Sequence, residues 1–170
     1  MTKSATKAAS AKKTITIERT FEGDLEDVWD LWTTKAGIEA WWGPEGFSTK
    51  VHALEPRPGG ALHYAMTARA PEQVAFMKKA GLPLTSDTHG TYDEIVPRTR
   101  LAFRQVADFI PGVAAYEIAT VVELRQSGEG VHMLLVVDAM HDEPWTRMAE
   151  HGWRSQIDKL AKVVAARAKK

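Results

Sequence analysis

The chain has 170 residues, of which 44% are hydrophobic and 26% charged, and its 22 basic side chains balance 22 acidic ones. These values are typical of one folded domain, and the zero net charge argues against nucleic acid as the main partner. The absence of cysteine excludes disulfides and thiolate metal sites. The lack of cysteine also agrees with the cytoplasmic location that we expect. No apolar run is long enough to span a membrane.

The first thirteen residues are rich in Ser, Thr, Ala and Lys, and they contain no acidic side chain. No apolar stretch follows these lysines, so the segment does not fit a secretory signal. We expect 1–13 to be a disordered basic tail and 14–168 to form a single domain.

Alternating polarity predicts a first strand over 14–22. Asp24 is then a candidate helix N-cap, because Leu25, Val28, Trp29 and Trp32 recur at helical spacing after it. A second short helix is expected over about 35–41. It stops at Trp41-Trp42-Gly43-Pro44, since Gly and Pro end helices and turn the backbone. This corner carries two large indoles that must fill a core or form the wall of a cavity.

Six further runs have the alternation or the apolar content of strands, and they cover 47–54, 61–67, about 90–96, 100–107, 114–125 and 130–138. A final helix is expected to begin near Pro144 with Asp142 as its cap, because apolar residues recur at three- and four-residue steps from Trp145 to Val164.

The long connection 68–89 interrupts this strand pattern. Pro71 suits the first position of a short helix, which we expect over 72–80. Phe76 and Met77 give that helix an apolar face. The segment is either a lid over a cavity or a flap packed on the domain edge.

Several separated phrases occur in the order typical of a known family. They are Ile17-Glu18-Arg19-Thr20-Phe21, Trp41-Trp42-Gly43-Pro44, Arg57-Pro58-Gly59-Gly60, 90–96, 100–103 and Gly152-Trp153. Together they resemble the helix-grip fold of the START and birch-pollen-allergen-like (SRPBCC) superfamily, in the branch named for the activator of the heat-shock protein 90 ATPase. The resemblance covers about residues 14–165. It implies an α+β fold with a curved antiparallel sheet of six to seven strands, wrapped on a long C-terminal helix, with two short helices after strand one.

This fold implies a space between the concave face of the sheet and the last helix. Side-chain alternation assigns a set of residues to that space as candidate ligand-binding residues, with Tyr64, Gln105, Tyr116 and Thr120 as its polar members. The alternative is that the same residues pack into a solid core. The candidates are Trp32, Trp41, Trp42, Leu62, Tyr64, Met66, Phe76, Phe103, Gln105, Tyr116, Ile118, Thr120, Met148 and Trp153.

Motifs for catalysis or metal binding are weak. The histidines lack the spacing of a helical zinc site, and His141-Asp142-Glu143 with His151 fits helix capping better than a metal site. Adjacent strand residues point to opposite faces, so Asp93 and Glu94 are not expected to act as an acid–base pair. No metal and no cofactor are therefore expected.

Charged side chains on the concave face would be sharper evidence for a site. Arg69, Arg104 and Glu117 are the candidates by position. Arg104 and Glu117 fall on the outer faces of their strands, where they are expected to pair across strands.

Three functions remain open. The first is binding of a small hydrophobic or amphipathic molecule. The second, implied only by the resemblance, is a co-chaperone-like module with a chaperone partner. The third is a cyclase- or hydrolase-like enzyme in which Tyr64, Tyr116 or an inward His132 serves as acid or base. The protein is expected to be a monomer or a weak homodimer formed through an edge strand.

Overall fold

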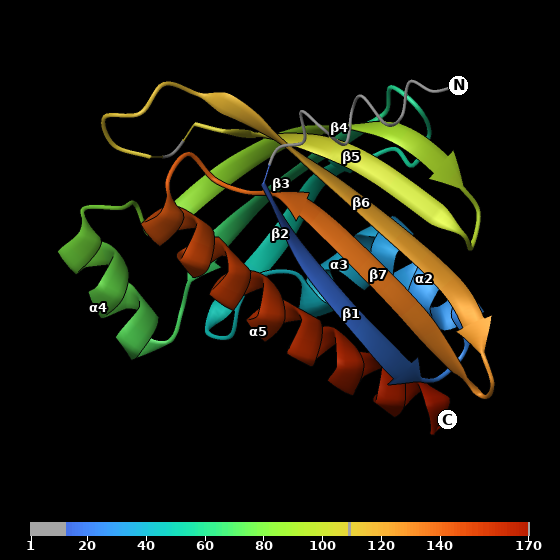
Figure 1. Ribbon diagram of the computed structural model, residues 1–170. Helices are drawn as coiled ribbons and strands as arrows, with labels where there is room; N and C mark the ends of the chain where they lie inside the picture. The colour runs from blue at the N-terminus through green and yellow to red at the C-terminus, as the bar shows by residue number, and fades with distance from the viewer. Residues whose placement is uncertain (1–12, 109, 170) are drawn as a thin grey trace.

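A computed structural model describes residues 13–108 and 110–169, so nearly all of the expected N-terminal tail lies outside the described residues. The chain forms a seven-stranded, wholly antiparallel sheet in the order β1-β7-β6-β5-β4-β3-β2 (Figure 1). The predicted helix-grip α+β class is confirmed. The strands are β1 Thr14–Glu22, β2 Phe47–Leu54, β3 Ala61–Ala68, β4 Thr85–Val96, β5 Arg100–Ala107, β6 Tyr116–Ser127 and β7 Gly130–Asp138.

The helices begin where local signals predict them. Asp142 accepts a hydrogen bond from the backbone N–H of Trp145 at 2.9 Å and so caps the long helix α5, Glu143–Ala168. Asp24 occupies the N-cap position of α2, but its side chain makes no cap hydrogen bond, so that prediction holds for the position alone. The other helices are α2 Leu25–Thr33, α3 Lys35–Trp41 and α4 Pro71–Ala80.

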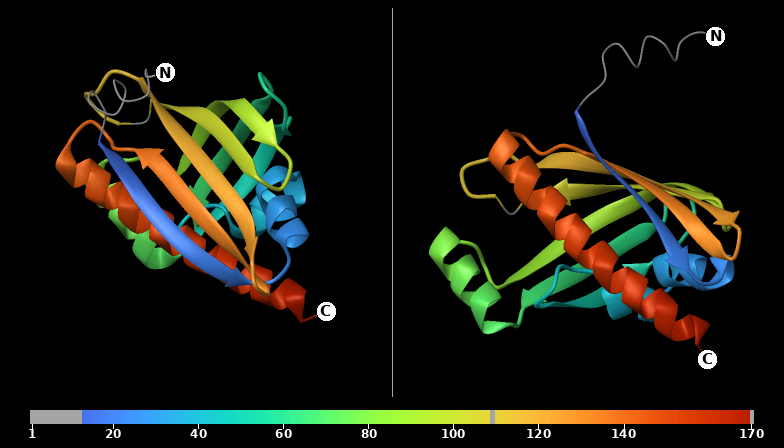
Figure 2. Two further views of the ribbon diagram at one scale, coloured as in Figure 1. Left: turned by 45° about the vertical axis from the view of Figure 1, so that its right-hand side comes forward. Right: turned by 60° about the horizontal axis from the view of Figure 1, so that its bottom comes forward.

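The long helix α5 runs diagonally across the strands, and α4 lies beside its N-terminal half (Figure 2). The C-terminal half of α5 buries Ile157, Leu160 and Val164 completely. These side chains join α2, α3 and the inward residues of the sheet in one hydrophobic cluster. The solid core therefore lies at the C-terminal end of α5.

Strand β4 begins at Thr85, five residues before the predicted start at 90. The added residues, Thr-Ser-Asp-Thr-His, carry no alternating apolar pattern, so the sequence did not indicate a strand there. They are ordered by pairing with β3, and the hydroxyl oxygens of Thr67 and Thr85 lie 2.9 Å apart. The predicted 68–89 connection is shortened by this pairing to 69–84.

A β-bulge in β4 corrects the prediction for Asp93 and Glu94. The register with β5 shifts between Tyr92 and Glu94, which leaves Asp93 as the extra residue. Both carboxylates therefore reach arginines on the outer face. Asp93 accepts from Arg104 Nε at 2.9 Å, and Glu94 accepts from Arg100 Nε at 2.8 Å.

The other charged candidates also lie away from the concave side. Arg104 Nη1 donates to Glu117 at 3.0 Å, which confirms the predicted cross-strand pair. Arg69 is exposed, and its Nε donates to the Ser48 hydroxyl at 3.0 Å. Neither arginine lines the pocket described below.

Candidate functional site

A pocket of about 740 Å³ lies between the concave face of the sheet, α4 and the N-terminal half of α5. Its lining is predominantly apolar and aromatic, with a few amide, hydroxyl and carboxylate groups. Eight of the fourteen residues expected at the site line it. They are Trp42, Tyr64, Met66, Phe76, Gln105, Ile118, Met148 and Trp153.

The pocket exists because the two halves of α5 pack differently. At the N-terminal half, Trp145, Ala149 and Trp153 are only partly buried, and Met148 is 40% exposed. These side chains line the pocket. Farther along the helix, the gap between α5 and the sheet is filled by core residues that include Ile157 and Leu160. The helix is thus anchored at one end and stands off the sheet at the other.

The Trp41–Pro44 corner is tied to the middle of α5. The N–H of Gly43 donates to Gln156 Oε1 at 2.9 Å, and the carbonyl of Gly43 accepts from Lys159 Nζ at 3.0 Å. Gly43 has a φ of 97°, a conformation that favours glycine because it has no Cβ. Farther along, the N–H of Glu45 donates to Ser155 Oγ at 2.9 Å. These bonds fix the position of Trp42.

The Trp42 indole separates the solid core from the pocket. On the core side its ring centroid lies 5.0 Å from that of Trp41 and 5.7 Å from that of Trp32. On the pocket side it lies 5.6 Å from Tyr64 and 5.4 Å from Trp153. All four contacts are edge-to-face, the arrangement that aromatic rings favour. Trp42 therefore forms a rigid wall of the pocket.

Tyr64 and Gln105 form the polar centre of the concave wall. Gln105 Nε2 donates to the Tyr64 hydroxyl. Burial raises the pKa of Tyr64, although hydrogen bonds with Trp42, Thr88 and Gln105 oppose the rise. At neutral pH Tyr64 is thus a neutral hydroxyl that can orient a ligand, and it is poorly suited to act as a base.

Six expected site residues do not line the pocket. Tyr116 lies at the start of β6, where its hydroxyl accepts from the His141 N–H at 3.1 Å and lies 3.0 Å from His141 Nδ1. The other five pack in the solid core with exposures of 2% or less, because α2 and α3 fill that end of the concave face. They are Trp32, Trp41, Leu62, Phe103 and Thr120.

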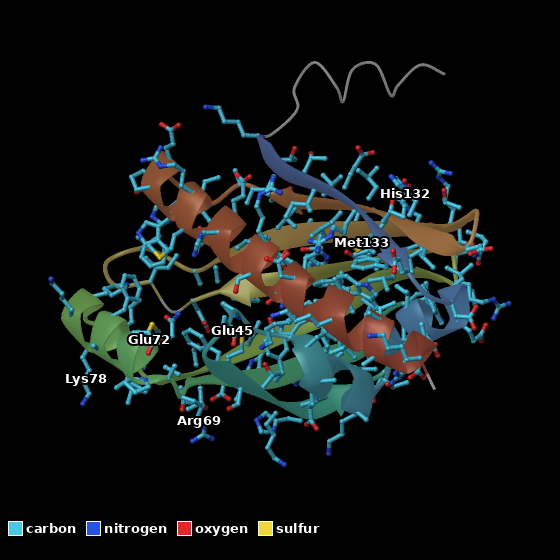
Figure 3. The ribbon with its side chains drawn as sticks, turned by 90° about the horizontal axis from the view of Figure 1, so that it is seen from below. Glu45, Arg69, Glu72, Lys78, His132 and Met133 are labelled. Atoms are coloured by element: carbon cyan, nitrogen blue, oxygen red, sulfur yellow. The ribbon has the colours of Figure 1, made fainter. Side chains whose placement is uncertain are left out.

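The histidines do not converge on the pocket. His132 points to the outer face of β7, where its Nε2 lies 3.6 Å from a carboxylate oxygen of Glu18, while its neighbour Met133 is fully buried (Figure 3). His132 therefore does not supply the inward acid or base that the enzyme hypothesis considered. Within residues 13–108 and 110–169, no group of three or more His, Asp or Glu side chains is arranged to hold a metal ion.

Sequence reasoning missed several polar lining residues, chiefly Gln156, Glu45 and Glu72. Gln156 is 5% exposed and sits within the apolar stripe of α5. An amide inside such a stripe is the signal that would have found it. Glu45 and Glu72 follow no motif, and only the approach of α4 to the Trp41–Pro44 corner brings them to one pocket.

Comparison with solved structures supports the fold. A protein from Chromobacterium violaceum is 24% identical, covers 89% of this chain and 96% of its own, and superposes with a TM-score of 0.73. The AHSA1 protein from Silicibacter pomeroyi is 19% identical, with coverages of 91% and 99% and a TM-score of 0.72. An AHSA1-like protein from Aeromonas hydrophila is 21% identical, with coverages of 93% and 96% and a TM-score of 0.69.

No curated protein sequence gives a significant match. Among the described helices, none has the length and apolar character needed to cross a membrane. The family model described as "Activator of Hsp90 ATPase homolog 1-like protein" matches residues 23–165, which is most of the chain. The predicted branch of the SRPBCC superfamily is confirmed, and the chain belongs to the family of Activator of Hsp90 ATPase homolog 1-like proteins.

Proposed function

We propose that the protein binds a small hydrophobic or amphipathic molecule in the pocket between β2–β6, α4 and α5. The observation that carries this proposal is the pocket of about 740 Å³ directly beside a well-packed core. Ligand sites commonly have about 300–1,000 Å³, mostly apolar walls and a few placed polar groups. Here the Tyr64–Gln105 pair and Gln156 supply those polar groups.

We further propose that 69–84, which includes α4, acts as a lid. This helix has no buried residue, and its Phe76 is 47% exposed although it lines the pocket. Leaving large apolar side chains in water is costly, and a bound apolar molecule would cover Phe76 and Met77. Gly81, at a φ of 75°, ends α4 in a conformation that glycine adopts without strain.

The first test is native mass spectrometry of the purified chain, followed by denaturing extraction of any bound molecule. A thermal-shift screen with apolar compounds then measures binding directly. The matched variants are Ala149→Phe, which adds a ring inside the pocket, and Ala166→Phe, which adds it on the exposed end of the same helix. Loss of binding in Ala149→Phe alone supports the proposal, and equal binding in both variants contradicts it.

Gln105→Leu tests the polar wall. It removes the donor to Tyr64 without changing the shape of the strand, so stability should change little. Ligand preference should shift toward molecules that lack a hydrogen-bonding group. Unchanged preference would show that Gln105 has no part in recognition.

A co-chaperone role is the second candidate, and the family match is the observation that favours it. Its test is stimulation of a heat-shock protein 90 ATPase by the purified chain. Stimulation that survives Ala149→Phe would assign this role to a surface outside the pocket. The absence of both stimulation and ligand binding would contradict both candidates.

A further inference from the structure

Two carboxylates line the pocket, and no lysine or arginine lies among its described lining residues. These carboxylates belong to Glu45 and Glu72. His151 and Tyr64 are the other ionisable side chains in the described part of the lining. Glu72 makes no ion pair with any described residue, so its charge is not neutralised locally.

Nearby basic side chains are directed elsewhere. Lys78 and Arg69 extend outward from the molecule, whereas Glu72 and Glu45 lie on the side between α4 and α5 (Figure 3). Lys159 is half-buried and does not line the pocket; its Nζ donates to the carbonyl of Gly43, and its charge interacts favourably with Glu45, which leaves Glu72, among the described residues, as the carboxylate without a nearby cation. An anionic group entering the pocket would therefore meet two carboxylates and no lining cation.

The aromatic walls also favour a positive charge. Trp42, Tyr64 and Trp153 contact one another through Trp42 and all line the pocket, together with Phe47 and Phe76. The faces of aromatic rings attract ammonium groups, most strongly where water is excluded. Ring-lined walls with carboxylates at the rim suit an organic cation.

The Gln105 amide, deeper in the pocket, also favours a ligand that carries positive charge. Gln105 donates through Nε2 to the Tyr64 hydroxyl, which leaves its Oε1 as an acceptor. A carbonyl oxygen stabilises a ligand that donates a hydrogen bond or carries positive charge, and it repels a carboxylate. Among its described lining residues the pocket therefore presents neutral polar groups, carboxylates and ring faces, and no lysine or arginine.

We propose that the pocket selects amphipathic organic cations, with an ammonium group near Glu72 and Glu45 and an apolar body against the aromatic walls, over carboxylate ligands. This inference rests on the proposed function, since it names the ligand class of the same pocket. An anion would lose its hydration without gaining an ionic partner, and such burial is unfavourable. A cation keeps a partner at the rim and gains contact with the rings.

The test compares octyltrimethylammonium, octanol and octanoate, which share one apolar chain and differ in charge. Binding to the full chain is measured by calorimetry at low salt. We expect the cation to bind at least about tenfold more tightly than octanoate, with octanol between them. Glu72→Gln should reduce the preference for the cation about threefold.

Glu150→Gln is the matched control, because it removes the same charge from α5 outside the pocket, where Glu150 pairs with Arg154. If octanol and octanoate bind as tightly as the cation, the charge preference is refuted while ligand binding stands. An equal effect of Glu72→Gln and Glu150→Gln also overturns it, since total charge would then explain the preference. If none of the three binds, the proposed function itself fails.

Discussion

Trp32 and Trp41 offer a matched test of the buried hydrogen bonding in this fold. Both indoles are 1% exposed or less, and their ring centroids lie 4.7 Å apart. The Trp41 N–H donates to the carbonyl of Leu31 at 2.9 Å. The Trp32 N–H has no partner among the described residues. Replacing either indole by Phe therefore removes a similar volume from the core. The Trp41 substitution removes a satisfied hydrogen bond, whereas the Trp32 substitution removes a buried donor that has no acceptor among the described residues.

Trp41→Phe loses a buried hydrogen bond with a net worth of about 0.5–1.5 kcal/mol, in addition to the volume lost from the core. Trp32→Phe loses comparable volume, but it also removes an unsatisfied donor whose burial costs about 1–3 kcal/mol. We therefore expect Trp41→Phe to destabilise the protein by about 2–4 kcal/mol more than Trp32→Phe does.

Urea denaturation followed by circular dichroism measures this difference, because fluorescence would change with the number of indoles. Equal denaturant slopes in the two variants would show that the midpoints report stability. A difference below about 0.5 kcal/mol, or greater damage from Trp32→Phe, would refute the hydrogen-bond argument.

Three further perturbations follow from single features. Thr120→Val should stabilise by about 1 kcal/mol in thermal melts, because the buried Oγ1 of Thr120 has no partner among the described residues; a loss of stability would contradict this. Burial raises the pKa of Tyr92, so the neutral phenol is favoured in the fold. The contribution of Tyr92 to the free energy of unfolding is at its maximum below pH 10, and it falls as the pH rises above 10 because the phenol ionises more readily in the unfolded chain. In alkaline denaturation, Tyr92→Phe should make this fall in stability less steep. Gly60→Ala should destabilise by about 3 kcal/mol, since its Cβ would lie 2.0 Å from the carbonyl oxygen of Glu55; an unchanged melting temperature would refute the clash.

Local signals in the chain were sufficient to predict most helices and strands. The alternation over 14–22 and the Gly43-Pro44 stop mark element boundaries through neighbouring residues alone. The Asp142 cap is equally local, because its side chain bonds to a backbone N–H three residues away. The start of β4 could not be predicted in this way, since Thr85 becomes part of a strand only through its partner on β3.

Period-two alternation also predicted which side chains point inward, but not how deep each lies. Leu62 and Met66 share the concave face of β3, yet Leu62 packs in the core while Met66 lines the pocket. The difference depends on whether α3 or the raised half of α5 covers that point of the strand. Alternation within a strand carries no information about how closely a helix packs over each of its inward residues.

The sequence by itself determined the order of the elements and the inward faces of the strands, because these depend on local patterns and short-range backbone preferences, whereas the helix-grip class came from the family resemblance of its separated phrases. Only the tertiary structure decided that Asp93 and Glu94 share the outer face, since the bulge is defined by register with β5. It also decided that Gln156, Glu45 and Glu72 reach one pocket. Their meeting depends on how α4 and α5 pack against the sheet, and contacts between residues so far apart leave no periodic signal in the chain.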